Sequence, residues 1–168
     1  FMKGLMHVGQ EQTGGGREGG ERSVGLSGTL ADYGFELRRL KTGTPPRLLS
    51  QSIDYNQLKE QAGDVDPAPF SFRTKSFAPV QVPCHMAYTH AGTHQIIANN
   101  LGRSPLFGGA IDGLGPRYCP SIEDKVVRFA DKDRHLLFLE PEGMNTDEVY
   151  VNGLSTSLPA DVQQLVVR

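Results

Sequence analysis

Proline and glycine interrupt this chain so often that only short helices and strands fit between them. The 168 residues include 20 glycines and 11 prolines, and four of the prolines lie in the single stretch DVDPAPFSFRTKSFAPVQVPC, residues 64–84. Proline fixes its own φ angle, lacks an amide donor and holds the preceding residue in extended backbone. We therefore predict an extended, irregular segment before Cys84, and short regular elements on either side of it.

Five segments carry the apolar spacing or the end signals of helices. In the first, residues 23–33, Val24, Leu26 and Leu30 follow a serine cap, and Gly34 supplies a stop. The others are residues 54–61 behind a cap at Asp54, residues 93–101, residues 122–130, and the end of the chain from Pro159.

Strand patterns lie between these helices. Residues 1–9, the alternating FELRRL at 35–40 and CHMAYTH at 84–90 are predicted strands, and HLLFLEPEG with DEVYVNG forms a predicted pair. Residues 11–22, EQTGGGREGGER, are predicted to be a glycine-rich polar loop. The mixture favours the α/β (mixed α+β) fold class, with a mixed sheet and short helices, over a helical bundle.

Charge and hydropathy exclude several classes of protein. The net charge of −2 and the pI of about 6.2 give no global attraction to nucleic acid or to an anionic membrane. The sequence has no apolar run long enough to cross a bilayer and no signal peptide, so we expect a cytoplasmic protein without a membrane partner. The two cysteines have no metal-ligand spacing, and we expect no metal site.

The stretch GPRYCPSIEDK places Cys119 just before a helix start. Ser121 and Asp124 have the spacing of a capping box, with Asp in place of the usual Glu or Gln. Free amides at a helix start favour a thiolate, and Arg117 would add positive charge. The residues alone leave two readings open for Cys119, a reactive thiol or a buried structural cysteine. Cys84 has no such setting, and we expect it to be structural.

The turn KTGTPPR combines two cations, two hydroxyl groups and a rigid Pro-Pro step. Two interpretations are open. The rigid turn would hold Lys41 and Arg47 in fixed positions toward an anionic ligand, or it is an ordinary solvated turn that follows a strand. The start of the helix at 122 would also hold a phosphate on its amides, although this signal is weak alone. The remaining charged groups are expected to be ordinary surface residues: His85, His90, His94, the carboxylates of EPEG, Glu123, Asp124 and Lys125.

Taken together and in order, GGGREGGERS, RLKTGTPPR, SIDY, GPRYCPSIEDKVVRFADKDRH, FLEPEG and NGLSTSLPADVQ resemble the MnmG or GidA family of tRNA-modifying flavoproteins. The resemblance covers nearly the whole chain. It implies part of a two-domain flavoprotein similar to glutathione reductase. The chain lacks the G-x-G-x-x-G flavin fingerprint of the N-terminal domain, starts at Phe1 and ends on an apolar run without a stop. We therefore expect a middle fragment that is inactive alone.

The resemblance also implies the chemistry of the parent enzyme. Such an enzyme uses FAD and NADH to add a carboxymethylaminomethyl or aminomethyl group at C5 of the wobble uridine of tRNA. Methylene-tetrahydrofolate would supply the carbon and glycine or ammonia the nitrogen, the GTPase MnmE would be the partner, and the full-length protein would be a homodimer. Residues 1–44 would adjoin the FAD-binding domain, 45–110 would form the inserted NAD-side domain, and 111–168 would carry the active-site segment back to the FAD-binding domain.

Matching the motifs of the family to this sequence implies a set of site residues. Cys119 would be the catalytic cysteine that acts at C6 or C5 of the uracil, because a thiolate added to C6 makes C5 nucleophilic. The NAD site would be Gly115, Pro116, Arg117, Tyr118, Cys119, Pro120, Ser121, Ile122, Glu123, Asp124, Lys125, Val126, Val127, Arg128 and Phe129. The flavin side would include Gly15, Gly16, Arg17 and Ser23. Cofactor or substrate phosphates would contact Lys41, Thr42, Thr44 and Arg47.

Two alternatives remain open from the sequence. The folate-dependent tRNA uracil-5 methyltransferase flavoprotein shares the general architecture, although LKTGTPPR and FLEPEG fit it less well. The second alternative is that the isolated segment is a non-catalytic module for dimerisation or for docking the GTPase.

Overall fold

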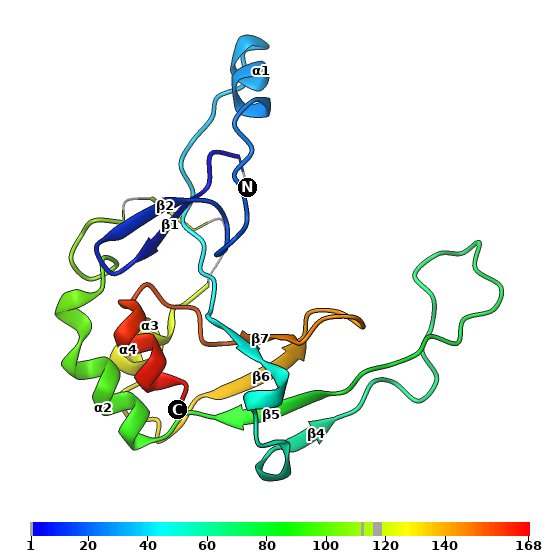
Figure 1. The fold of residues 1–168 in the computed structure, drawn as a ribbon. Coiled ribbons are helices and arrows are strands. Elements are labelled where there is room, and N and C mark those ends of the chain that lie inside the picture. Colours follow the sequence, from blue (N-terminus) through cyan, green and yellow to red (C-terminus); the bar gives the residue numbers. More distant parts are fainter. Residues whose placement is uncertain (1, 112, 116–118) are drawn as a thin grey trace.

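A five-stranded sheet forms the centre of the molecule (Figure 1). The structure, a computed structural model, describes residues 2–111, 113–115 and 119–168. The strand order is β3-β7-β6-β5-β4, and every pairing is antiparallel rather than mixed in direction. The strands are β3 Arg47–Leu49, β4 Lys59–Gln61, β5 Cys84–Tyr88, β6 Leu136–Pro141 and β7 Glu148–Asn152. A separate hairpin pairs β1, Leu5–Val8, with β2, Glu11–Gly14.

Three of the four α-helices gather against β6 and β7 (Figure 1). The α-helices are α1 Leu26–Asp32, α2 Ala91–Asn99, α3 Ile122–Arg128 and α4 Ala160–Val166, with 3-10 turns η1 Ser50–Ser52, η2 Tyr55–Gln57 and η3 Leu101–Arg103. The core consists of Ile97, Ile122, Leu137, Leu139, Val149, Val151, Leu154, Leu158 and Val162. Among the described helices, none is long and apolar enough to span a bilayer.

Most of the predicted elements are confirmed. The mixed helix-and-strand fold class, the strands at β1 and β5, the β6–β7 pair and helices α1 to α4 all lie where the patterns placed them. Gly34 follows α1 with a positive φ of 83°, a conformation that favours glycine, so the predicted stop is confirmed. The serine cap of α1 is wrong, because Gly25 is the N-cap and no side chain bonds there.

Three predictions of local secondary structure are wrong. In each case the outcome depends on whether another strand pairs with the segment, which the segment's own sequence does not show. Residues 35–40 form no strand, only a single bridge from Leu40 to Leu114, because no neighbouring strand pairs with their alternating pattern. Residues 11–14 form β2 rather than a loop, since they pair with β1. Residues 54–61 form no α-helix: Asp54 does cap a 3-10 turn, but residues 59–61 then pair with β5 as strand β4.

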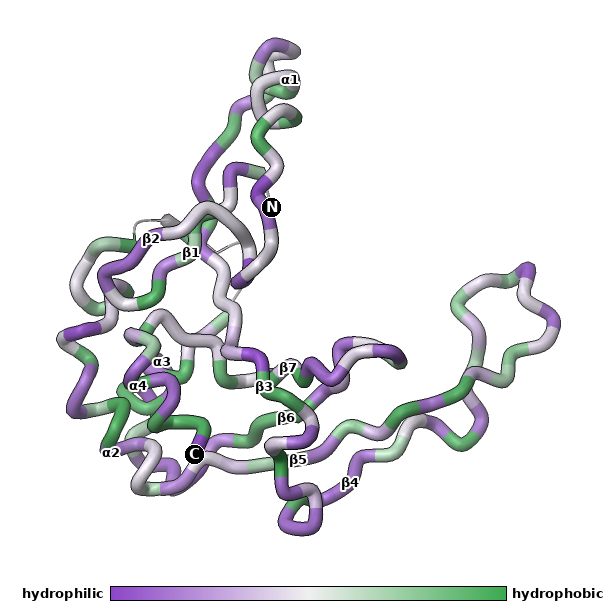
Figure 2. The backbone as a smooth tube through the Cα atoms, in the orientation of Figure 1, coloured by the Kyte–Doolittle hydropathy of each residue, from purple (hydrophilic) through white to green (hydrophobic). Residues whose placement is uncertain are grey.

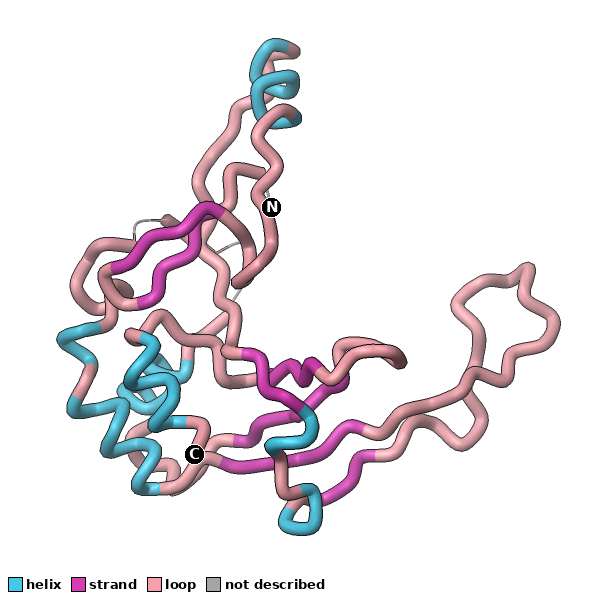
Figure 3. The backbone as a smooth tube through the Cα atoms, viewed as in Figure 1, coloured by secondary structure: helices cyan, strands magenta, loops and turns pink. Residues whose placement is uncertain are grey.

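Residues 62–83, which we call the arm, leave the sheet between β4 and β5 and return to it (Figures 1 and 3). The arm contains neither helix nor strand, which confirms the prediction from its prolines. Gln81 donates from Nε2 to the Asp64 carbonyl at 2.7 Å and joins the two sides of the arm near the sheet.

A buried threonine joins β6 to the start of α2. Thr89 Oγ1 accepts from the His135 backbone amide at 2.8 Å and lies 2.8 Å from His94 Nε2. The rings of His94 and His135 lie 5.1 Å apart, and Nε2 of His135 is buried without a hydrogen-bond partner among the described residues. His90 caps α2, because its Nδ1 accepts from the Gly92 amide at 3.1 Å. His90 and His94 are thus bonded within the fold.

Acid should destabilise the protein through His135. Burial, followed by the positive charges of His94 and Lys125, lowers the pKa of His135 from its ordinary value of 6.5. The folded state therefore binds fewer protons than the unfolded state, and this contribution is present above pH 6.5 and lost as the pH falls below it. Urea unfolding from pH 8 to pH 5 should show this loss, and His135→Gln should flatten the profile. An unchanged profile in that variant would contradict the assignment.

Candidate functional site

Three segments that are distant in the sequence meet beside the start of α3. The Lys41 amide donates to the Leu114 carbonyl at 3.0 Å, and the Thr156 amide donates to the Thr44 carbonyl at 3.3 Å. The Ile122 amide donates to the Ser155 carbonyl at 2.7 Å. These bonds bring KTGTPPR, the segment before α3 and GLSTSLP into one assembly, which we call the junction.

Close packing at the junction explains one glycine of KTGTPPR. A Cβ atom added at Gly43 would lie 2.8 Å from the Cβ of Ser155. Real Cβ atoms do not approach so closely, so a side chain here would separate the two segments. The glycine is therefore required by contact between KTGTPPR and GLSTSLP rather than by its φ angle.

The capping box at the start of α3 is confirmed. Ser121 Oγ accepts from the Asp124 amide at 3.1 Å, and Asp124 Oδ2 accepts from the Ser121 amide at 3.1 Å. Cys119 lies two residues before the cap and is exposed. The amides of Ile122 and Asp124 are both bonded within the protein, so neither is available to hold a phosphate.

Glu123 is wholly buried, and its expectation as an ordinary surface charge is wrong. Its side chain is 0% exposed, and its Oε1 accepts from the Ser157 amide at 3.1 Å and from Ser104 Oγ at 3.2 Å. Its Oε2 has no hydrogen-bond partner among the described residues. The helical pattern missed this because α3 turns its first residues toward Ser104 and Ser157, which come from other parts of the chain.

Lys125 and Tyr150 are the described titratable groups whose pKa values depend on Cys119. Lys125 donates from Nζ to the Gly153 carbonyl at 2.8 Å, so it is fastened to the protein rather than solvated as expected. Burial lowers the pKa of Lys125, and the charge of a Cys119 thiolate opposes that effect. Burial raises the pKa of Tyr150; Arg47 lowers it, and Glu140 and Cys119 add to the increase. The charge of a Cys119 thiolate would thus act on the pKa values of both an ammonium group and a phenol.

Arg47 holds a second part of the site together. Its Nε donates to Glu142 Oε1, its Nη1 donates to Thr44 Oγ1 at 2.7 Å, and its guanidinium lies 4.7 Å from the ring centre of Tyr150. The Arg47 hydrogen bond is the largest cause that lowers the pKa of Glu142. Glu142 is exposed, as expected for a carboxylate of EPEG, but its carboxylate is also ion-paired within the protein.

Arg17 reaches the same carboxylate from the glycine-rich loop. Its Nη1 donates to Glu142 Oε2 at 2.7 Å and to Glu148 Oε2 at 2.9 Å. Arg17 and Arg47 therefore both bind carboxylates of this chain, instead of standing free for phosphates. Because Arg17 and Arg47 both bind Glu142, they connect the loop after β2 to the start of β3 and the end of β6.

The structure brings some of the predicted site residues together and separates others. Thr44, Arg47, Cys119 and Lys125 belong to the junction or contact groups at it. Gly15 and Gly16 lie in the loop after β2, and Ser23 bridges to Met2. Pro116, Arg117 and Tyr118 lie outside the described residues. Sequence reasoning missed Tyr150 and Glu142; the strict alternation of buried Val149 and Val151 would have placed Tyr150 on the opposite face of β7.

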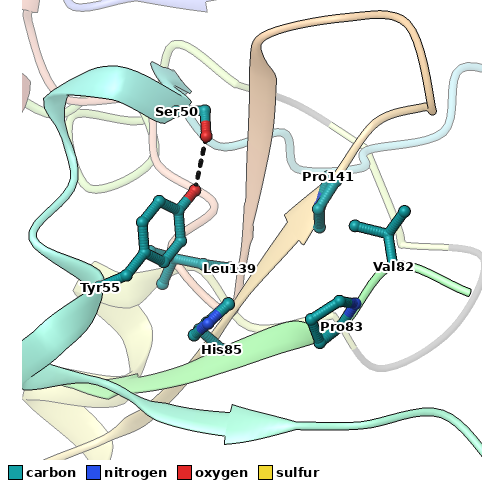
Figure 4. Close-up of a pocket in the computed structure, with 7 residues that line it drawn as sticks. All are labelled: Ser50, Tyr55, Val82, Pro83, His85, Leu139 and Pro141. Carbon is teal, nitrogen blue, oxygen red and sulfur yellow. Dashed lines mark hydrogen bonds between the residues drawn. The ribbon is translucent and has the colours of Figure 1, made fainter.

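A separate hollow of about 190 Å³ lies at the base of the arm (Figure 4). Its lining residues are Ser50, Tyr55, Val82, Pro83, His85, Leu139 and Pro141. Tyr55 and His85 face each other with ring centres 4.6 Å apart, and the Tyr55 hydroxyl bonds to Ser50 Oγ at 2.9 Å. His85 is thus packed rather than solvated. None of the predicted site residues that the structure describes lines this hollow. Within the part of the chain that the structure describes, no group of His, Cys, Asp or Glu would hold a metal ion.

Comparison with known proteins gives a consistent result. The family model described as glucose inhibited division protein A matches residues 1–168. A tRNA uridine 5-carboxymethylaminomethyl modification enzyme MnmG from Rhodopirellula baltica is 56% identical over 168 residues, which are 100% of this chain and 26% of that protein. The enzyme of the same name from Chlamydia muridarum is 59% identical over 100% of this chain and 28% of its own length.

A solved structure agrees in fold. Aquifex aeolicus GidA in its form I crystal superposes with a TM-score of 0.80 at 49% identity, covering 99% of this chain and 29% of that chain. The chain described here therefore spans about a quarter of the length of the relatives it matches.

Proposed function

The chain belongs to the glucose inhibited division protein A family, and on that premise we propose that it is the Cys119-bearing segment of a tRNA-modifying enzyme. The whole enzyme would attach a carboxymethylaminomethyl or aminomethyl group to C5 of the wobble uridine. The curated relatives carry the name of such an enzyme. The observation that carries the proposal is the junction, where three family motifs meet beside an exposed cysteine.

The exposure of Cys119 and its place just before the capped start of α3 support a role in nucleophilic catalysis on uracil. Its thiolate would form an Sγ–C6 bond, and the electron pair of the C5–C6 double bond would move onto C5 and the adjoining carbonyl. C5 would then attack the methylene carbon of methylene-tetrahydrofolate, which breaks one carbon–nitrogen bond to the folate, and glycine or ammonia would displace the remaining folate nitrogen from that carbon. Loss of the C5 proton and cleavage of the Sγ–C6 bond would restore the aromatic pyrimidine and the thiolate. The Lys125 ammonium and the Tyr150 hydroxyl supply the nearby polar groups.

The described residues do not make a complete cofactor site. A Cβ at Gly15 would lie 2.4 Å from the Gly20 carbonyl, so this glycine serves a turn within its own loop rather than an open cradle. Arg17 is bound to Glu142 and Glu148, and two amides of α3 are already bonded. FAD and NADH would therefore be held mainly by the rest of the parent enzyme, with residues 115–129, apart from the buried Ile122 and Glu123, contributing to the NADH side.

The remaining assignments follow from the family. We propose methylene-tetrahydrofolate as the carbon donor, the GTPase MnmE as partner, a homodimeric parent protein and a cytoplasmic location. The proposed division is residues 1–44 beside the FAD-binding domain, 45–110 on the NAD side and 111–168 carrying Cys119. The central sheet takes β3, β4 and β5 from the second of these segments and β6 and β7 from the third, so these two would fold together.

Product analysis tests the proposed activity. The full-length protein should be incubated with an unmodified tRNA transcript, the GTPase with GTP, FAD, NADH, methylene-tetrahydrofolate and either glycine or ammonium, and the tRNA should then be digested to nucleosides for mass spectrometry. We expect an aminomethyl or carboxymethylaminomethyl group on the wobble uridine. A methyl group at C5 would instead identify the folate-dependent methyltransferase, and an unmodified wobble nucleoside would contradict both activities.

A further inference from the structure

The arm ends in a preformed turn that presents aromatic and basic side chains to solvent. At its tip, the Thr74 amide donates to the Ser71 carbonyl at 3.1 Å, and the Arg73 amide donates to Ser71 Oγ at 3.2 Å. This turn places Phe72 and Arg73 at its two central positions. Phe70 and Phe72 are fully exposed, and Phe77 is exposed as well.

The tip has a composition different from that of the rest of the chain. Residues 70–77, FSFRTKSF, consist only of three phenylalanines, two cations and three hydroxyl residues. No acidic residue occurs between Asp66 and Cys84, although the whole chain has a net charge of −2. The tip is therefore a local positive region on an acidic protein, and Figure 2 shows hydrophilic and hydrophobic segments alternating along the arm.

This alternation fits a nucleic acid better than it fits a protein surface. The apolar core of a protein interface is contiguous and is depleted in Lys and Ser. In the tip, by contrast, each phenylalanine is separated from the next by a serine or by a stretch with both cations. Aromatic rings interleaved with cations are what single-stranded nucleic acids require, because bases stack on the rings and phosphates pair with the cations.

We propose that the arm binds an unpaired loop of the RNA substrate, with bases stacked on Phe70 and Phe72 and phosphates paired with Arg73 and Lys75. The inference rests on the proposed function, since that function supplies tRNA as the partner. It adds a contact surface that is distinct from the junction around Cys119.

The test asks whether tRNA binding by the full-length protein depends on the aromatic rings of the arm or only on their apolar volume. Fluorescence anisotropy with an unmodified tRNA transcript should show that Phe70→Leu/Phe72→Leu weakens binding by roughly tenfold or more, because leucine keeps the apolar bulk but offers no face for stacking. Phe70→Tyr/Phe72→Tyr should bind as the wild type does. Val80→Ala is the matched control, since Val80 is exposed on the same arm but carries no ring.

A second variant tests the phosphate contacts. Arg73→Gln/Lys75→Gln should reduce the slope of log K against log salt by about 1.4, which is the value for two phosphates of a single strand. Light scattering and the flavin absorbance of each variant should match the wild type.

The outcomes separate this inference from the proposed function. If the wild type binds tRNA and the leucine variant binds it equally well, the arm inference is overturned while the proposed function stands. If the leucine variant loses subunit association or flavin, the arm is a protein contact and the inference is again overturned. If the wild type does not bind tRNA at all, the proposed function fails and the inference fails with it.

Discussion

Cys119→Ser in the full-length enzyme is expected to lower the rate of wobble-uridine modification by at least about 100-fold. A serine hydroxyl is a far weaker nucleophile than a thiolate toward C6 of uracil, and among the described residues no base is bonded to the side chain at position 119 to activate it. Because Cys119 is exposed, its replacement should leave the unfolding midpoint unchanged. The rate should be measured by nucleoside mass spectrometry, with tRNA binding measured in parallel.

Cys84→Ser is the matched control for that experiment. Cys84 lies half-buried on β5, and burial, with the charge of Glu140, raises the pKa of its thiol. Its replacement should leave the modification rate near that of the wild type, and iodoacetamide should label Cys119 faster than Cys84 in the folded protein. Full activity of Cys119→Ser would return Cys119 to a structural role and would remove the proposed covalent step.

Glu123→Ala is expected to cost about 2–4 kcal/mol of unfolding free energy, the largest stability effect that we predict. The substitution leaves the Ser157 amide and the Ser104 hydroxyl without their buried acceptor, and it opens a cavity where the wholly buried Glu123 side chain lay. Urea unfolding followed by circular dichroism measures the change.

Two further variants separate the buried carboxylate from ordinary helix capping. Ser121→Ala removes the cap of α3 and should cost about 1 kcal/mol. Glu123→Gln keeps one acceptor oxygen and should cost less than the alanine variant. If Glu123→Ala costs no more than Ser121→Ala, the Ser104–Glu123–Ser157 contacts do not contribute as the structure indicates. Because Glu123 fastens α3 to the segment at Ser157, its loss should also change the labelling rate of Cys119.

The elements that could be predicted were those whose signals are local. The capping box of Ser121 and Asp124, the stop at Gly34 and the alternation in β7 each depend on residues within a few positions. The failures share a different cause. FELRRL alternates as a strand does but lacks a neighbouring strand, while EQTG looks like a loop but pairs with β1. Strand pairing is a property of two segments, and one segment does not contain it.

The features of the candidate site likewise separate into those that were predictable from the sequence and those that only the folded structure revealed. The sequence by itself determined that Cys119 precedes a capped helix, that the arm is extended and that the chain carries the motifs of its family. Only the tertiary structure showed that Glu123 is buried, that Arg17 and Arg47 share Glu142, and that Arg47 lies over the ring of Tyr150. Capping and proline geometry act over a few residues, whereas burial and ion pairing depend on which distant segments the folded chain brings into contact.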